Sequence, residues 1–156
     1  MRSKKKQNWR SGLEKQFMEL LNKAKVPFKY EQETFKYTVP EKVHKYTPDF
    51  ILPGGTVIET KGQWGLEDRK KISWFVKQHP EILFRMVFSN PHQRINKKSK
   101  TRYADICNKL KIPWCSIKDM DTLLYWIEED KQRVESALNK VIMKRRDSNE
   151  KNKKIY

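Results

Sequence analysis

The spacing of hydrophobic and polar positions predicts a helix near the start of the chain and strands after it. Residues 12–26 carry apolar side chains at helical intervals, namely Leu13, Phe17, Leu20 and Leu21. Ser11 can cap this helix, and Pro27 ends it. From Phe28 to Val39, aromatic and polar residues alternate, which predicts one strand. Residues 40–45 are expected to form a connector.

A glycine turn, Gly54-Gly55, separates two short apolar strands within residues 46–61 and predicts a hairpin. With a three-residue loop, Asp49 lies directly opposite Glu59. With a two-residue loop, Asp49 lies opposite Thr60, and Glu59 becomes its diagonal neighbour. Either register keeps the two carboxylates within the ~4.5–8 Å that separates cross-strand neighbours.

The rest of the chain alternates between helical and strand patterns. The predicted elements are a helix at Leu66–His79, a buried strand at Leu83–Ser89, a helix at Tyr103–Leu110, a short strand at Ile112–Ile117 and a long amphipathic helix at Asp121–Arg145. The last helix has apolar residues on one side: Leu124, Ile127, Val134, Leu138 and Val141. Residues 1–10 are expected to form a mobile basic arm, and residues 147–156 a disordered charged tail. This order predicts one small mixed α/β domain.

The charge of the chain narrows the class of partner. Lys and Arg number 35 against 19 acidic residues, a net charge of +16. Such an excess attracts polyanions, most simply nucleic acid, and a membrane surface is the main alternative. No run of about 20 apolar residues is present, so no segment is expected to cross a bilayer. No apolar segment follows the first lysines, so we expect no secretory signal and a cytoplasmic location.

The two cysteines, Cys107 and Cys115, form no Cys-x-x-Cys pair and have no histidine at zinc spacing. We expect both to be reduced thiols in the core of an intracellular protein.

The predicted hairpin brings together residue types that suit phosphodiester hydrolysis. Asp49 and Glu59 repel each other when held close, unless a cation lies between them. Carboxylate oxygens suit Mg²⁺ or Mn²⁺, and Lys61 shares a strand face with Glu59. The lysine would orient or deprotonate a water molecule, or neutralise phosphate charge. Acid-x-base triplets are common in a chain this charged, so an exposed ladder of ion pairs is the alternative.

A longer series of motifs makes the nuclease hypothesis more specific. The run Tyr46-Thr47-Pro48-Asp49-Phe50, followed by Glu59-Thr60-Lys61-Gly62, is similar to the active-site core of the phage endonuclease I family. The similarity covers roughly residues 10–117 and continues in Arg10–Glu14, Asp68–Lys71, Gln78–Glu81 and Val87–Ser89. The family comprises four-way-junction resolvases within the PD-(D/E)xK nuclease superfamily. The resemblance therefore implies a restriction-endonuclease-like fold, α/β (α+β), with a mixed central sheet flanked by helices. Residues 11–117 would form this nuclease domain, and residues 118–146 a helical extension.

The resemblance also implies a role for each residue of the site. Asp49 and Glu59 would bind a metal ion together with the backbone carbonyl of Thr60. Lys61 would be the catalytic lysine, and Glu14 would reach a second metal ion. The implied cofactor is Mg²⁺, with Mn²⁺ as a plausible substitute. Apart from the resemblance, Glu14 is equally explained as an acid favoured at a helix N-terminus.

One position departs from the family pattern. Lys29 stands where the first strand of the family carries a carboxylate. Glu31 lies two residues further on, on the same predicted strand face, and is the candidate for the supporting role.

The resemblance further implies an intertwined homodimer whose N-terminal element swaps across a short connector, here residues 40–44. A composite site would then combine Glu14 of one chain with Asp49, Glu59 and Lys61 of the other. The implied setting is the cytoplasm of a phage-infected host. Basic side chains expected to contact DNA, with solvated surface charge as the alternative, are Arg10, His44, Arg69, Lys70, Lys71, Arg94, Lys97 and Lys98.

We therefore expect a metal-dependent DNA endonuclease that cuts branched DNA such as four-way junctions. One alternative is a sequence-selective, homing-type endonuclease acting on long duplex DNA, which the Lys29 departure and the C-terminal helix would favour. The other is a nucleic-acid-binding protein without catalytic activity, which would keep the charge but need no metal.

Overall fold

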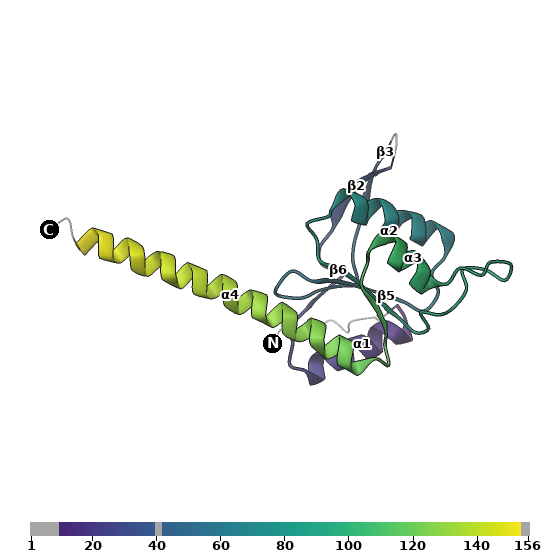
Figure 1. Ribbon diagram of the computed structural model, residues 1–156, viewed down its shortest axis with the longest axis horizontal. Coiled ribbons are helices and arrows are strands. Elements are labelled where there is room, and N and C mark those ends of the chain that lie inside the picture. Colours follow the sequence, from purple (N-terminus) through teal and green to yellow (C-terminus); the bar gives the residue numbers. More distant parts are fainter. Residues whose placement is uncertain (1–9, 40–41, 154–156) are drawn as a thin grey trace, which may run out of the picture.

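A mixed central sheet organises the protein (Figure 1). The computed structural model describes residues 10–39 and 42–153, and for residues 147–153 it describes the backbone only. In this part of the chain, five strands form the sheet in the order β1 (Lys29–Tyr30), β4 (Phe50–Ile51), β5 (Val57–Lys61), β6 (Phe84–Phe88) and β7 (Trp114–Ser116). The pairs β1–β4 and β4–β5 are antiparallel, whereas β5–β6 and β6–β7 are parallel. The predicted mixed sheet flanked by helices is confirmed.

Helices cover both faces of this sheet (Figure 1). They are α1 (Gly12–Lys23), α2 (Leu66–Gln78), α3 (Tyr103–Leu110) and α4 (Met120–Lys153). Phe17 of α1 and Trp126 of α4 belong to one buried cluster, which includes Ile58 of β5. Phe75 of α2 and Cys107 of α3 belong to a second cluster. Because successive side chains of a strand point to opposite faces of the sheet, the strands contribute to two hydrophobic cores, one on each face.

The predicted strand at residues 28–39 is two strands in different sheets. Strand β1 belongs to the central sheet, whereas β2 (Phe35–Val39) pairs with β3 (Lys42–Tyr46) in a separate hairpin. The break follows Tyr30, because Glu31 adopts a left-handed backbone conformation with φ of 49°. Such a conformation is uncommon for a residue with a side chain and turns the chain out of the strand.

The predicted connector at residues 40–45 is also wrong in part, because Lys42 to Lys45 belong to β3. Pro40 and Glu41 lie outside the described residues. The β2–β3 hairpin projects beyond the central sheet (Figure 1) and is anchored to the end of α2. There the Thr38 amide donates to Gln78 Oε1 at 2.7 Å. Strand β3 is polar enough to resemble a connector, and its pairing with β2 decides its conformation.

Helix α4 is longer than predicted and only partly packed. Its backbone is helical through Lys153, into the segment expected to be a disordered tail. Leu123, Trp126 and Ile127 are buried, but the second half of the helix runs past the body of the protein (Figure 1). Part of the predicted apolar side therefore remains exposed, including Leu138 at 58%.

Two further expectations concern the cysteines and the membrane. Cys107 and Cys115 are buried free thiols, and burial raises the pKa of each to about 12.

Across residues 10–39 and 42–153, no helix combines the length and the apolar composition that a bilayer crossing requires. The basic arm at residues 1–10 lies outside the described residues except for Arg10.

Candidate active site

The β4–β5 hairpin uses the three-residue loop. Phe50 pairs with Ile58, and the Leu52 amide donates to the Thr56 carbonyl at 2.9 Å. Gly55 closes the turn with φ of 90°, a conformation that glycine adopts without steric cost. Continuing this register by one pair places Asp49 directly opposite Glu59. The alternative two-residue loop, with Asp49 facing Thr60, is wrong.

Asp49 is a nearly buried carboxylate, 9% exposed. Its Oδ2 accepts hydrogen bonds from the Thr60 amide at 2.8 Å and from the Thr60 hydroxyl at 2.9 Å. Burial raises the pKa of Asp49 to about 7, and repulsion from Glu59 adds to the rise, although both Thr60 hydrogen bonds oppose it. The site therefore holds a negative charge that the surrounding protein only partly compensates.

Glu59 is buried more deeply, at 2% exposure, and uses both carboxylate oxygens. Its Oε2 accepts a hydrogen bond from the Tyr46 hydroxyl and a longer one, 3.4 Å, from the Asp49 amide. Its Oε1 lies 2.9 Å from Lys61 Nζ. Burial and the charge of Glu59 raise the pKa of Tyr46 well above its ordinary value, so the phenol remains a hydrogen-bond donor.

Lys61 joins the carboxylate pair to helix α2. Its Nζ lies 3.7 Å from Asp68 Oδ2, and Asp68 Oδ1 in turn lies 3.3 Å from Lys71 Nζ. Burial lowers the pKa of Lys61, but Glu59 and then Asp68 and Asp49 outweigh that effect, so its pKa is raised. The lysine is therefore a cation in this arrangement. The alternative suggested by spacing alone was an exposed ladder of ion pairs. It does not describe Asp49 and Glu59, because both carboxylates are buried.

A sequence model of the family described as Phage endonuclease I matches residues 1–148. The chain belongs to the phage endonuclease I family. It is 41% identical over 128 residues to Endonuclease I of Escherichia phage T7, covering 81% of this chain and 83% of that protein. It is 45% identical over 101 residues to Endodeoxyribonuclease 1 of Enterobacteria phage T3, covering 65% of this chain and 66% of that protein. The predicted family is confirmed.

Membership in the phage endonuclease I family extends further along the chain than the motifs indicated. The match reaches residue 148, so most of α4 lies within the region shared with the family. The helix therefore does not lie beyond the region of similarity, and it no longer favours a homing-type endonuclease over other targets.

Two residues of the site were not predicted as functional. Tyr46 donates to Glu59, and Asp68 lies between Lys61 and Lys71. Asp68 is in the first turn of α2, which begins soon after β5 ends. Because that turn follows β5, the strand that carries Glu59 and Lys61, an acid there was a usable signal. Tyr46 gave no such signal, since its spacing is equally typical of a core strand residue.

Glu14 lies in a separate cluster in this single chain. Its Oε2 accepts hydrogen bonds from the Arg10 amide at 2.9 Å and the Tyr30 hydroxyl at 2.5 Å. Glu14 also stands in the first turn of α1, where the Ser11 side chain accepts from its amide. Within the described residues, no three His, Cys, Asp or Glu side chains gather closely enough to hold a metal ion. Glu14 therefore does not form a three-carboxylate metal site with Asp49 and Glu59 within the described part of this single chain.

Lys29, which stands where the family carries a carboxylate, and Glu31, its predicted substitute, have different surroundings in the structure. Lys29 is exposed and pairs with Glu33. Glu31 does not share a strand face with Lys29 as predicted, because it lies just beyond β1 in the left-handed conformation. Its side chain lies 3.1 Å from Arg10 Nε, and its amide donates to the Asp49 carbonyl at 3.2 Å. Glu31 thus connects Glu14 and Arg10 to the backbone of the β4–β5 hairpin.

The basic residues proposed for DNA contact fall in several places. His44 is on β3, stacked on Tyr37 with ring centroids 5.4 Å apart. Arg69 donates to the Trp64 carbonyl, and Lys70 pairs with Glu67 at 3.0 Å. Beyond the ends of β5 and β6, an open cavity of about 560 Å³ includes in its lining Gln63, Gly65, Gln93, Arg94, Asn96 and Lys97. Lys98 is an exposed neighbour on the same loop.

Proposed function

We propose that the protein is a metal-dependent DNA endonuclease that hydrolyses phosphodiester bonds in branched DNA such as four-way junctions. One observation carries the chemistry: the register of β4 and β5 places Asp49 opposite Glu59, and Lys61 Nζ lies 2.9 Å from Glu59. The family and the names of the phage T7 and T3 relatives support a nuclease that acts on DNA.

The donor set fits a hard divalent cation such as Mg²⁺ or Mn²⁺. Asp49 and Glu59 are buried next to each other, and their repulsion contributes to the raised pKa of Asp49. The Thr60 carbonyl would complete the protein ligands. A cation bound there would neutralise the carboxylates and stabilise negative charge on the scissile phosphate.

Lys61 would act as a cation during the reaction. Its raised pKa keeps the ammonium group protonated at neutral pH, so it can donate a hydrogen bond to a phosphate oxygen. Of the predicted roles for this lysine, neutralising phosphate charge suits the geometry better than removing a proton from water. Tyr46 and Asp68 would hold Glu59 and Lys61 in place.

The choice of branched DNA is supported by charge and by the proposed assembly. A net charge of +16 favours binding to closely spaced phosphates. A homodimer would present two sites to two strands, and its composite sites would take Glu14 from the partner. A purely architectural DNA-binding protein would have no use for two buried carboxylates facing each other, because that arrangement is costly without a cation.

Digestion of a four-way junction and a matched duplex with Mg²⁺ tests this function. We expect junction cleavage that Glu59→Ala or Lys61→Ala lowers by on the order of 10³-fold while junction binding remains. Glu67→Ala, at an exposed position of α2, is the control and should cleave normally. Unchanged cleavage by Glu59→Ala would refute the site.

The same experiment separates the remaining target classes. Equal cutting of junctions with unrelated sequences would exclude a homing-type endonuclease. Cutting confined to one duplex sequence would exclude junction resolution. If the protein bound DNA but cleaved neither substrate with any divalent metal, the non-catalytic nucleic-acid-binding protein would be the remaining alternative.

A further inference from the structure

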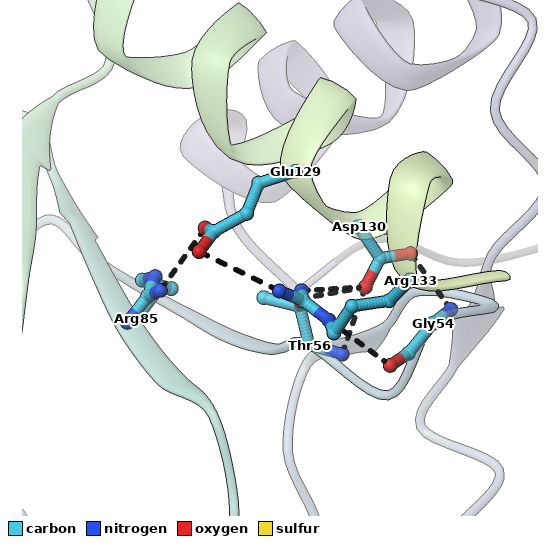
Figure 2. A network of polar contacts seen from close by, with 6 residues as sticks. All are labelled: Gly54, Thr56, Arg85, Glu129, Asp130 and Arg133. Carbon is cyan, nitrogen blue, oxygen red and sulfur yellow. Dashed lines mark hydrogen bonds and ion pairs between the residues drawn. The ribbon is translucent and has the colours of Figure 1, made fainter. Parts of the chain in front are cut away.

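The turn of the catalytic hairpin is held by a buried carboxylate of α4, Asp130, which is 1% exposed. Asp130 Oδ2 accepts a hydrogen bond from the Gly54 amide at 2.7 Å. Asp130 Oδ1 accepts from the Thr56 amide at 3.0 Å and from the Thr56 hydroxyl at 2.6 Å (Figure 2). Three donors of the turn thus converge on one side chain that lies more than 70 residues away in the sequence.

Arg133, one turn further along α4, completes the arrangement. Its Nη2 lies 3.2 Å from Asp130 Oδ1 and also donates to the Thr56 hydroxyl oxygen. Its Nε donates to the Gly54 carbonyl at 3.4 Å. The cost of burying the Asp130 charge is therefore offset by an ion pair and by hydrogen bonds on both oxygens. Figure 2 shows the two side chains directed from α4 toward the turn.

Helix α4 also approaches the turn so closely that a side chain at position 54 would force the helix or the turn to shift. A Cβ atom built on Gly54 would lie against the backbone oxygen of Asp130 and 2.8 Å from its carboxyl carbon. The turn and the helix are therefore matched in shape as well as in polar groups.

The contact between Asp130 and the turn affects the active site because the turn sets the pairing register of β4 and β5. A glycine-containing loop permits either two or three residues between the strands. A slip of one residue would place Asp49 opposite Thr60 and turn Glu59 to the other face of the sheet, because successive side chains of a strand point to opposite faces. The expectation that either register keeps the two carboxylates together is therefore wrong, and only the three-residue loop does so. The Asp130 hydrogen bonds hold the amides at positions 54 and 56 in the three-residue arrangement.

We propose that Asp130 and Arg133 are positioning residues of the active site. By fixing the turn, they select the register in which Asp49 faces Glu59, and they link the geometry of the hairpin to helix α4. The catalytic consequence rests on the nuclease function proposed above, whereas the structural consequence does not.

Asp130→Asn in the full-length protein tests the proposal. An asparagine keeps the size but replaces one acceptor oxygen with a donor that faces the turn. We expect hydrogen-exchange protection of the Gly54 and Thr56 amides to fall about tenfold or more. We also expect kcat for junction cleavage with Mg²⁺ to fall about 10²-fold while KM stays near the wild-type value, because the defect is one of alignment.

Two further variants keep the test decisive. Glu128→Gln is the matched control on the same helix, because Glu128 is exposed and stands two positions before Asp130. It should retain wild-type amide protection and kcat. Thr56→Val replaces the side-chain hydroxyl with a methyl group and keeps the Thr56 amide, so it serves if Asp130→Asn does not fold, and it should show a smaller loss of the same kind.

The outcomes distinguish the two proposals. Wild-type protection and kcat in Asp130→Asn would overturn the positioning role and leave the nuclease function intact. An equal loss in Glu128→Gln would also overturn it, because a general effect on helix α4 would then explain the data. If the wild-type protein cuts no DNA with any divalent metal, the nuclease function fails, and hydrogen exchange by itself decides whether Asp130 holds the register.

Discussion

Asp49 occupies a position where its charged form is disfavoured. Its pKa is raised from an ordinary 3.8 to about 7, first by burial and then by Glu59. A group whose pKa is higher in the folded than in the unfolded protein stabilises the fold below the unfolded value and loses that contribution as pH rises through the folded value. The metal-free protein should therefore lose stability between about pH 4 and pH 7.

Replacing this carboxylate with an amide should stabilise the metal-free protein. The shift of Asp49 corresponds to roughly 4 kcal/mol, so we expect Asp49→Asn to gain a few kcal/mol of unfolding free energy at pH 8 and nothing at pH 4. Urea unfolding at both pH values measures the difference. Glu67→Gln, an exposed control, should change stability little at either pH. A loss of stability in Asp49→Asn at pH 8 would contradict the assigned electrostatic cost.

The raised pKa of Asp49 should also make metal binding depend on pH. Mn²⁺ must displace the proton of Asp49, so its affinity should rise as pH increases toward 7 and level off above it. Isothermal titration with Mn²⁺ between pH 5.5 and pH 8.5 checks this expectation. An affinity independent of pH would show that Asp49 is not a ligand, or that it is already ionised without the metal.

At the scale of elements, local sequence predicts the β4–β5 hairpin but does not fix its loop length. A few residues are enough to recognise the two strands and the glycine turn. The loop length depends on a distant residue, because Asp130 of α4 accepts hydrogen bonds from the amides of Gly54 and Thr56. The β2–β3 hairpin follows the same rule, since β3 becomes a strand through its pairing with β2 and not through its own apolar pattern.

Glycine positions with different surroundings provide a test at this scale. Gly54→Ala should cost about 1–3 kcal/mol, because the new Cβ would press against Asp130 and α4 would have to shift. Gly12→Ala, in the first turn of α1 with nothing within 4 Å, should be neutral or stabilising by up to about 1 kcal/mol. Thermal unfolding of both variants measures the contrast. Equal effects would contradict the close approach of α4 to the turn.

At the scale of the whole molecule, the position of Glu14 is informative. In a single chain it accepts hydrogen bonds from Tyr30 and Arg10, and within the described residues it forms no three-carboxylate group with Asp49 and Glu59. Yet Glu31, which contacts both Arg10 and the Asp49 carbonyl, lies between the two groups. The proposed homodimer would bring Glu14 of one protomer to the hairpin of its partner.

Mixed dimers of two inactive variants test this composite site. In a heterodimer of Glu14→Ala and Glu59→Ala protomers, one composite site carries both defects and the other carries none. We therefore expect each homodimer to be inactive and the heterodimer, isolated with two affinity tags, to nick one strand at about half the wild-type rate. An inactive heterodimer would show that Glu14 acts within its own chain. Failure to form any mixed species would contradict the homodimer.

The sequence by itself determined the parts of this protein that depend on local spacing. It located α1, α2 and α3, the core strands β5 and β6, the glycine turn, and the chemistry-bearing trio Asp49, Glu59 and Lys61, because periodicity and turn residues act over a few positions. It also indicated the family, through short motifs in a fixed order.

Only the tertiary structure decided what depends on contacts between distant residues. It divided residues 28–39 between two sheets, selected the three-residue loop, and assigned Tyr46 and Asp68 to the carboxylate pair. It also buried Asp130 against a turn 76 residues away in the chain. The physical reason is the same in each case: a buried polar group is tolerated only when a partner satisfies it, and that partner is supplied by the fold and not by sequence neighbours.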